Sequence, residues 1–350
     1  MRIHKHGGDI YQDGIRVDFS ANINPLGPPK GVRRAACESL AWMEYYPDVE
    51  CRALGQALAE KEGVLRKQLI FGNGAAELIF ALAMAIRPQK ALLTAPSFAE
   101  YEQALTASEC HCTYYNRRDG FLVGEDFLEQ ISDELDLVIL CNPNNPTGDL
   151  LKKEFLENVL ECCARHQVVL AVDECFLGFL ERPQDYSLKE YLKGFPNLFL
   201  LNAFTKLYAM PGLRLGYGMC SDERLLERMR GVLQPWNVSI PAQAAGEAAL
   251  REDGYVRETR KLIRRERSYL EQEMSALGLR VYPGTVNFLF FEGPADLGER
   301  MRRLGILIRD CSNYRGLRKG YFRIAVRTRE DNNGLLEALR TCMQQETRTV

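Results

Sequence analysis

Short, continuously apolar segments alternate with segments of helical periodicity between about residues 65 and 220. The apolar segments cover residues 69–72, 91–95, 136–141, 168–172, 198–202 and 213–219. Strands that are buried on both faces are apolar along their whole length, so we predict that these segments are strands. Because helical segments lie between them, the expected fold class is α/β, with a large domain whose mainly parallel sheet is flanked by helices.

The pattern changes after Pro241. A long helical stretch rich in Arg and Glu is expected over residues 242–277. Shorter strands are then expected at 281–291, 306–309 and 321–326, and helices at 295–304 and 330–345. The prolines near the start of the chain favour an extended segment there. We therefore expect an N-terminal arm (1–30), a large domain (31–241), and a linking helix with a smaller α+β domain (242–350).

Charge and composition exclude several classes of protein. Lys and Arg number 45 against 47 Asp and Glu, a net charge of −2, which argues against binding nucleic acid or a membrane surface by charge. No apolar run reaches the roughly 18 residues that span a bilayer, and we expect no secretory signal. The eleven Cys are irregularly spaced without a CxxC pair. We expect reduced, mostly buried thiols in a cytoplasmic protein, and no metal site.

Two loops that follow predicted strands could contact a ligand, since ligands bind at the carboxyl edge of open α/β sheets. Gly72–Glu77 ends a strand and opens a helix, so its backbone amides would suit a phosphate. A plain turn explains this segment equally well. Asn142–Gly148 holds two prolines and a glycine, which would present the amide of Asn145 rigidly or simply form a tight turn.

Two further strand ends carry charged residues. Asp173 ends an apolar strand, where a carboxylate is costly to bury unless it meets a cation or caps a helix. Lys206 follows another apolar strand, and a buried lysine that loses its proton can form an imine with an aldehyde. Arg214 lies eight residues later and could bind a phosphate bidentately. Surface Lys and Arg are usually only solvated, so each residue alone indicates little.

Together, these four segments resemble the fold-type I, pyridoxal-phosphate-dependent aminotransferase family over nearly the whole chain. The resemblance implies that Lys206 binds the cofactor pyridoxal 5′-phosphate as an imine. Asp173 would pair with the pyridine nitrogen, and Asn145 would bond the ring 3′ oxygen. Two positions depart from the family pattern: Ala203 stands where a Ser is frequent, and Phe176 stands where many members have Tyr. These departures remove one phosphate contact and one phenol.

The same resemblance implies roles for further residues. The cofactor phosphate would be held by Gly74, Ala75, Thr205 and Arg214. Phe98, or alternatively Tyr101, would stack on the ring. Tyr46 would reach the cofactor phosphate of a partner subunit, so a homodimer is expected. Arg323 would bind the substrate carboxylate.

Two subgroups of this family are close to the chain: threonine-phosphate decarboxylases of cobalamin biosynthesis and histidinol-phosphate aminotransferases. Segments 6–8, 18–27 and 306–317 look like the first. The implied reaction is loss of carbon dioxide from L-threonine O-3-phosphate, which gives (R)-1-amino-2-propanol O-2-phosphate. The alternative is transamination of a phosphorylated substrate such as histidinol phosphate, and L-serine O-phosphate also stays open as a substrate. The expected substrate-binding residues are His6, Asn22, Asn24, Arg323 and Arg327.

Overall fold

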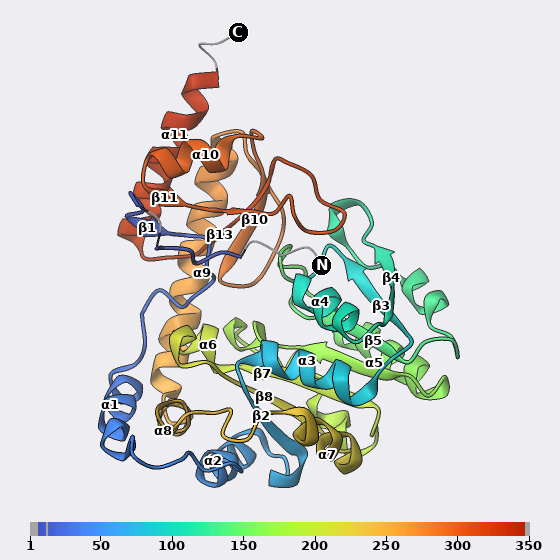
Figure 1. The fold of residues 1–350 in the computed structure, drawn as a ribbon. Helices are drawn as coiled ribbons and strands as arrows, with labels where there is room; N and C mark the ends of the chain where they lie inside the picture. The colour runs from blue at the N-terminus through green and yellow to red at the C-terminus, as the bar shows by residue number, and fades with distance from the viewer. Residues whose placement is uncertain (1–5, 12, 347–350) are drawn as a thin grey trace.

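The computed structural model describes residues 6–11 and 13–346, and its largest element is a seven-stranded sheet (Figure 1). The strand order is β2-β8-β7-β6-β5-β3-β4. These strands are β2 (Leu69–Asn73), β3 (Lys90–Ala95), β4 (His111–Asn116), β5 (Leu137–Cys141), β6 (Val169–Asp173), β7 (Leu198–Ala203) and β8 (Leu215–Cys220). All six segments predicted as strands are confirmed, and the mainly parallel α/β fold is confirmed with them.

Two features of this sheet differ from the sequence pattern. β8 runs antiparallel to both β2 and β7, whereas the other neighbouring pairs are parallel. β4 was not predicted, because it lies at the sheet edge and most of its residues are partly exposed. An edge strand of this kind lacks the continuous apolar run of a central strand.

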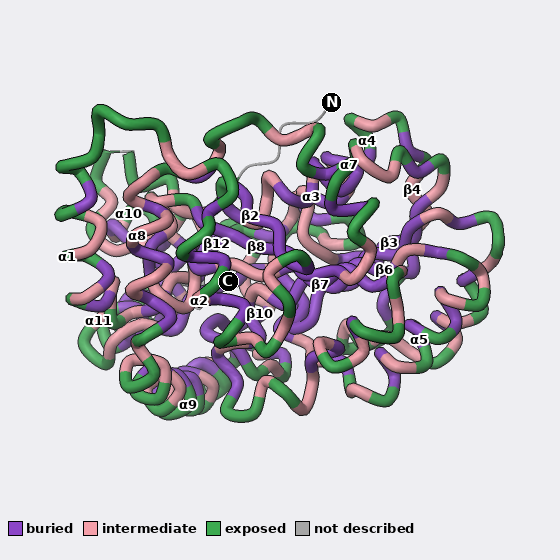
Figure 2. The backbone as a smooth tube through the Cα atoms, turned by 90° about the horizontal axis from the view of Figure 1, so that it is seen from below, coloured by how far each residue is buried: buried purple, intermediate pink, exposed green. Residues whose placement is uncertain are grey.

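Helices cover both faces of the sheet. In β5, Val138 and Leu140 contribute to one apolar core, while Leu137 and Ile139 contribute to another on the opposite face. The first core includes residues of α2 (Arg52–Glu62), α5 (Lys153–Arg165) and α8 (Ile240–Ala249), and α1 (Lys30–Glu38) packs on α8. The second includes residues of α3 (Ala75–Ile86), α4 (Ala99–Ala107) and α7 (Glu223–Val232). Figure 2 shows the resulting buried strands inside an exposed outer layer.

The C-terminal part of the chain builds a second sheet, of order β12-β13-β10-β9. The elements of this part of the chain are α9 (Asp253–Ala276), β9 (Arg280–Val281), β10 (Phe288–Glu292), α10 (Leu297–Arg303), β11 (Ile306–Leu307), β12 (Arg309–Asp310), β13 (Tyr321–Ala325) and α11 (Arg329–Glu346). The helical stretch expected over 242–277 is two helices, α8 and α9, and the strand expected over 281–291 is interrupted between β9 and β10. In Figure 1, α9 runs from the seven-stranded sheet toward this second sheet.

The N-terminal segment is not only an extended arm. Its residues Val17–Asp18 form β1, which pairs in parallel with β11. Residues 17–18 are therefore held against the C-terminal part, far away in sequence. In the described part of the chain, no helix is both long enough and apolar enough to cross a membrane.

Candidate active site

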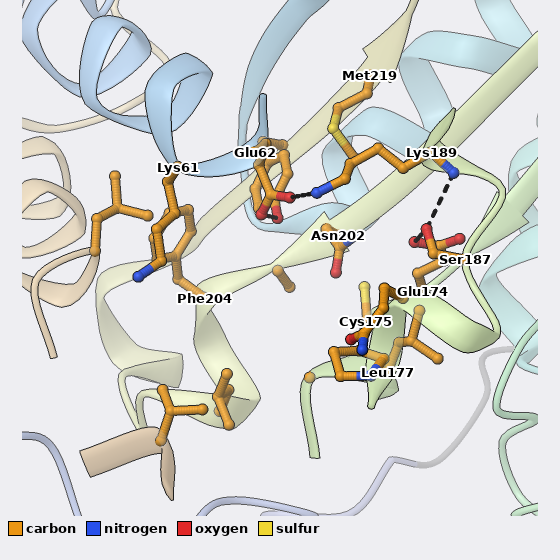
Figure 3. A pocket seen from close by; sticks show the side chains of 18 of the residues that line it. Lys61, Glu62, Glu174, Cys175, Leu177, Ser187, Lys189, Asn202, Phe204 and Met219 are labelled. Carbon is orange, nitrogen blue, oxygen red and sulfur yellow. Dashed lines mark hydrogen bonds and ion pairs between the residues drawn. The ribbon is translucent and has the colours of Figure 1, made fainter. Parts of the chain in front are cut away.

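A cavity of about 320 Å³ lies at the carboxyl ends of β5, β6 and β7. It brings together most of the residues that the sequence indicated: His6, Asn22, Ala75, Phe98, Asn145, Asp173, Thr205, Lys206, Arg214 and Arg323. Two other cavities are larger, one of about 490 Å³ (Figure 3) and one of about 850 Å³. Neither of them is lined by Lys206, Asp173 or Arg214, so chemistry rather than size identifies the site.

Lys206 is presented by a short helix, α6 (Phe204–Leu207), that begins directly where β7 ends. Burial lowers the pKa of its amine to about 8, and the positive charges of Arg323 and Arg214 act in the same direction. Cys175 and Glu100 oppose this shift. A larger fraction of the amine is therefore neutral at neutral pH than at the surface, as attack on an aldehyde requires.

Asp173 is the last residue of β6 and is held by two donors. The hydroxyl of Tyr101 donates to Oδ2 at 2.5 Å, and the backbone N–H of Cys175 donates to Oδ1 at 2.9 Å. Burial raises the pKa of the carboxyl, whereas these hydrogen bonds and the charge of Lys206 lower it. Of the two candidates for stacking on the ring, Phe98 lines the cavity, whereas Tyr101 is hydrogen-bonded to Asp173 and does not line it.

The start of α3 and Arg214 form a cradle for a phosphate. Gly74 has φ +80°, and a Cβ there would lie 2.4 Å from Nη2 of Arg214. A Cβ at Gly216 would lie 2.4 Å from the backbone nitrogen of Ala75. Gly74 therefore allows the guanidinium of Arg214 to approach the start of α3, and Gly216 allows β8 to pack closely against it. Backbone N–H groups at a helix N-terminus favour an anion.

Two buried arginines, Arg309 and Arg323, also line the cavity. Arg323 donates to Oδ1 of Asn145 and to the backbone oxygen of Ser20 (2.9 Å), and its Nε has no partner among the described residues. Arg309 donates to the backbone oxygen of Asp310 and to Oδ1 of Asn313. In the described part of the chain, no carboxylate forms an ion pair with either guanidinium. Buried cations paired only with neutral groups indicate a site for an anionic ligand.

Four of the expected site residues do not line this cavity. One of them, Gly74, directly precedes the cavity residue Ala75 at the start of α3. The amide of Asn24 donates to the backbone of Leu207 and to Oγ1 of Thr259, each at 2.7 Å. Arg327 pairs with Asp331 at 3.0 Å and donates to the backbone oxygen of Asp18. Tyr46 is 76% exposed and stacks on Trp236.

Besides Arg214 and Arg323, a third arginine lines the cavity: Arg309, to which the sequence alone assigned no role. The sequence feature that could have identified it is its position directly after the apolar residues 306–308, which were expected to form a strand. The two departures from the family pattern are also in place. Phe176 lines the cavity and packs edge-on against Phe288 at 5.1 Å between ring centroids, and Ala203 lines it without a hydroxyl.

The residues present fit pyridoxal 5′-phosphate. This cofactor offers an aldehyde, a pyridine nitrogen and a phosphate, and it acts as an electron sink. Lys206 would provide the amine for the aldehyde, Asp173 would provide the carboxylate for the nitrogen, and the start of α3 with Arg214 would hold the phosphate. Phe98 and Asn145 line the space between these groups.

Comparisons with known proteins agree with this geometry. The family model described as aminotransferase class I and II matches residues 15–339. Threonine-phosphate decarboxylase of Salmonella typhimurium is 39% identical over 352 residues, covering 97% of this chain and 96% of that protein. The histidinol-phosphate aminotransferase of Clostridium acetobutylicum superposes with a TM-score of 0.89 at 29% identity, covering 94% of this chain and 100% of that chain. L-threonine-O-3-phosphate decarboxylase of Porphyromonas gingivalis superposes with a TM-score of 0.82 at 26% identity, covering 93% and 99%. The chain therefore belongs to the class I and II aminotransferase family and is a pyridoxal-phosphate-dependent enzyme.

Proposed function

We propose that this enzyme decarboxylates L-threonine O-3-phosphate to (R)-1-amino-2-propanol O-2-phosphate in cobalamin biosynthesis, in the cytoplasm. The observation that carries the proposal is the pair of buried arginines, Arg309 and Arg323, in the cavity that holds Lys206. The substrate carries a carboxylate and a phosphate, and each anion needs a cation when it leaves water. The Salmonella relative supports the same reaction.

The side chains of the cavity divide the work of this reaction. The cofactor supplies an electron sink when bound. Arg323 and Arg309 orient the two anionic groups of the substrate. Lys206 can accept and return a proton near neutral pH, since the pKa of its amine is lowered to about 8. The carboxyl group of Asp173 is fixed by hydrogen bonds from Tyr101 and Cys175. It would pair with the pyridine nitrogen of the bound cofactor.

His6 and Asn22 extend the substrate site from the N-terminal segment. Both line the cavity, and Asn22 is buried there. We assign both to the substrate phosphate. Asn24 and Arg327 support this site from outside, since Asn24 ties the segment to α6 and α9.

A second candidate is transamination of a phosphorylated amine such as histidinol phosphate. The high TM-score with the Clostridium aminotransferase favours it. In that reaction the carboxylate partner of Arg323 would be the amino-acid co-substrate. The two reactions differ in whether the bond to the carboxylate or the bond to hydrogen is broken at the α-carbon.

One assay separates these candidates. The holoenzyme is incubated with threonine phosphate, serine phosphate or histidinol phosphate, with and without 2-oxoglutarate, and carbon dioxide and keto-acid consumption are measured. Decarboxylation predicts catalytic release of carbon dioxide from threonine phosphate without keto acid. Turnover that requires 2-oxoglutarate would establish the aminotransferase instead.

We also propose that the enzyme is a homodimer. Large apolar side chains are exposed close together in the sequence between α1 and α2, namely Leu40, Trp42, Met43, Tyr45, Tyr46 and Val49. Tyr46 stacks on Trp236, which is exposed as well. Clustered exposed aromatic residues are typical of a protein interface. Tyr46 would contact the cofactor phosphate of the partner subunit from this surface.

A further inference from the structure

Glu100 is a carboxyl group of the cavity that the proposed reaction has not used. It lies in the first turn of α4, and its side chain is 13% exposed. Oε1 is 3.1 Å from Nδ1 of His6, whereas Oε2 is buried and has no hydrogen-bond partner among the described residues. A buried polar atom without a partner costs free energy, so Oε2 marks a position where a ligand group would be bound.

The groups that face Glu100 are mostly cationic. Lys206, Arg309 and Arg323 act on its charge, and Glu100 in turn acts on Tyr314. Burial nevertheless raises the pKa of Glu100 to about 7, although its own backbone N–H and these three cations lower it. Near neutral pH a proton can therefore be placed on this carboxyl at little cost.

Charge balance decides which form of Glu100 suits the substrate. A phosphate carries about −1.5 to −2 charges at pH 7, and the carboxylate adds one more. Arg309 and Arg323 supply two positive charges, and Arg214 is assigned to the cofactor phosphate. An ionised Glu100 would add a further negative charge in a site already rich in them. The neutral acid instead offers an O–H donor.

We propose that Glu100 binds the substrate as a neutral carboxylic acid, donating a hydrogen bond from Oε2 to an anionic group of the substrate. Where Glu100 is ionised beforehand, substrate binding takes up one proton from solvent. The inference rests on the proposed function to the extent that the substrate is phosphorylated. It makes Glu100 a specificity-determining residue that favours substrates rich in negative charge.

The test compares KM of the holoenzyme at several pH values for wild type, Glu100→Gln and Glu100→Ala. For a group that titrates near pH 7, wild-type KM should rise about 25-fold between pH 6.5 and 8.5 relative to Glu100→Gln, whose amide donates at every pH. Glu100→Ala should raise KM roughly tenfold even at pH 6.5, because the donor is lost. Glu174→Gln is the matched control, since the pKa of Glu174 is also raised to about 7 but its side chain does not line this cavity. This control should keep the wild-type pH dependence.

Other outcomes overturn the inference. If Glu100→Gln and Glu100→Ala share the KM and the pH dependence of wild type, Glu100 does not contact the substrate. If both variants change the cofactor absorbance or kcat but not KM, the residue is structural. The proposed function is decided separately, by whether wild type turns over threonine phosphate without keto acid. The Glu100 comparison is then made on whichever phosphorylated substrate is turned over.

Discussion

Replacing Glu174 with glutamine should remove a pH-dependent cost of folding. Glu174 follows β6 and is only 2% exposed. Ser187 Oγ donates to its Oε2 at 2.9 Å, and the backbone N–H of Leu188 donates to Oε1 at 3.3 Å. Figure 3 shows it in the cavity of about 490 Å³, with Glu62 and Lys189 nearby. Burial raises the pKa of this carboxyl to about 7, although its two hydrogen bonds lower it.

The sign and size of the effect follow from proton linkage. An unfolded Glu has a pKa near 4.5. Between pH 4.5 and 7 the folded protein keeps the proton that the unfolded chain has lost, so the free energy of unfolding falls as pH rises. At 1.36 kcal/mol per pKa unit, the loss above pH 7 is about 3 kcal/mol. Glutamine is neutral at every pH, so the variant escapes this loss.

The assay is urea denaturation of cofactor-saturated protein at pH 5 and pH 8, because bound cofactor contributes to stability and has to be held constant. The free energy of unfolding of Glu174→Gln minus that of wild type should increase by about 2.5 kcal/mol from pH 5 to pH 8, because a small part of the loss has already occurred at pH 5. Glu181→Gln is the control, since Glu181 is exposed and pairs with Arg264 at the surface. Its difference from wild type should stay nearly constant. An equal difference for Glu174→Gln at both pH values would refute the reasoning.

Three further predictions concern the active site and the interface. Lys206→Ala should lose several powers of ten in kcat, measured as carbon dioxide release, and a rate near wild type would remove Lys206 from the mechanism. Gly74→Ala should weaken cofactor binding by roughly tenfold or more, because the new Cβ would clash with Arg214. Absorbance titration measures this affinity, and an unchanged value would contradict the phosphate cradle. Trp42→Glu should shift the sedimenting species from about twice 39.8 kDa toward 39.8 kDa, because a charge on an apolar interface is costly to desolvate. A wild-type monomer would contradict the homodimer.

The amino-acid sequence alone determined the sheet and the chemistry placed at its edge. Central strands such as β5 and β6 were visible because burial on both faces demands an unbroken apolar run. Asn145, Asp173 and Lys206 were identifiable because each lies at the end of such a strand or within four residues after it. Parallel strands end at the same edge of the sheet, so local order along the chain already implied that these side chains lie close together.

Only the tertiary structure decided which distant residues join them. Arg309 and Arg327 lie on either side of Arg323 in the sequence. The pairing of β12 with β13 brings Arg309 beside Arg323, while Arg327, two residues before α11, pairs with Asp331 of that helix. The unpartnered oxygen of Glu100 depends likewise on contacts between segments far apart in the chain. The parallel pairing of β1 with β11 also depends on a contact between segments far apart in the chain. Sequence periodicity reports which face of an element is buried, whereas a long-range contact depends on how whole elements pack, and no local pattern encodes that.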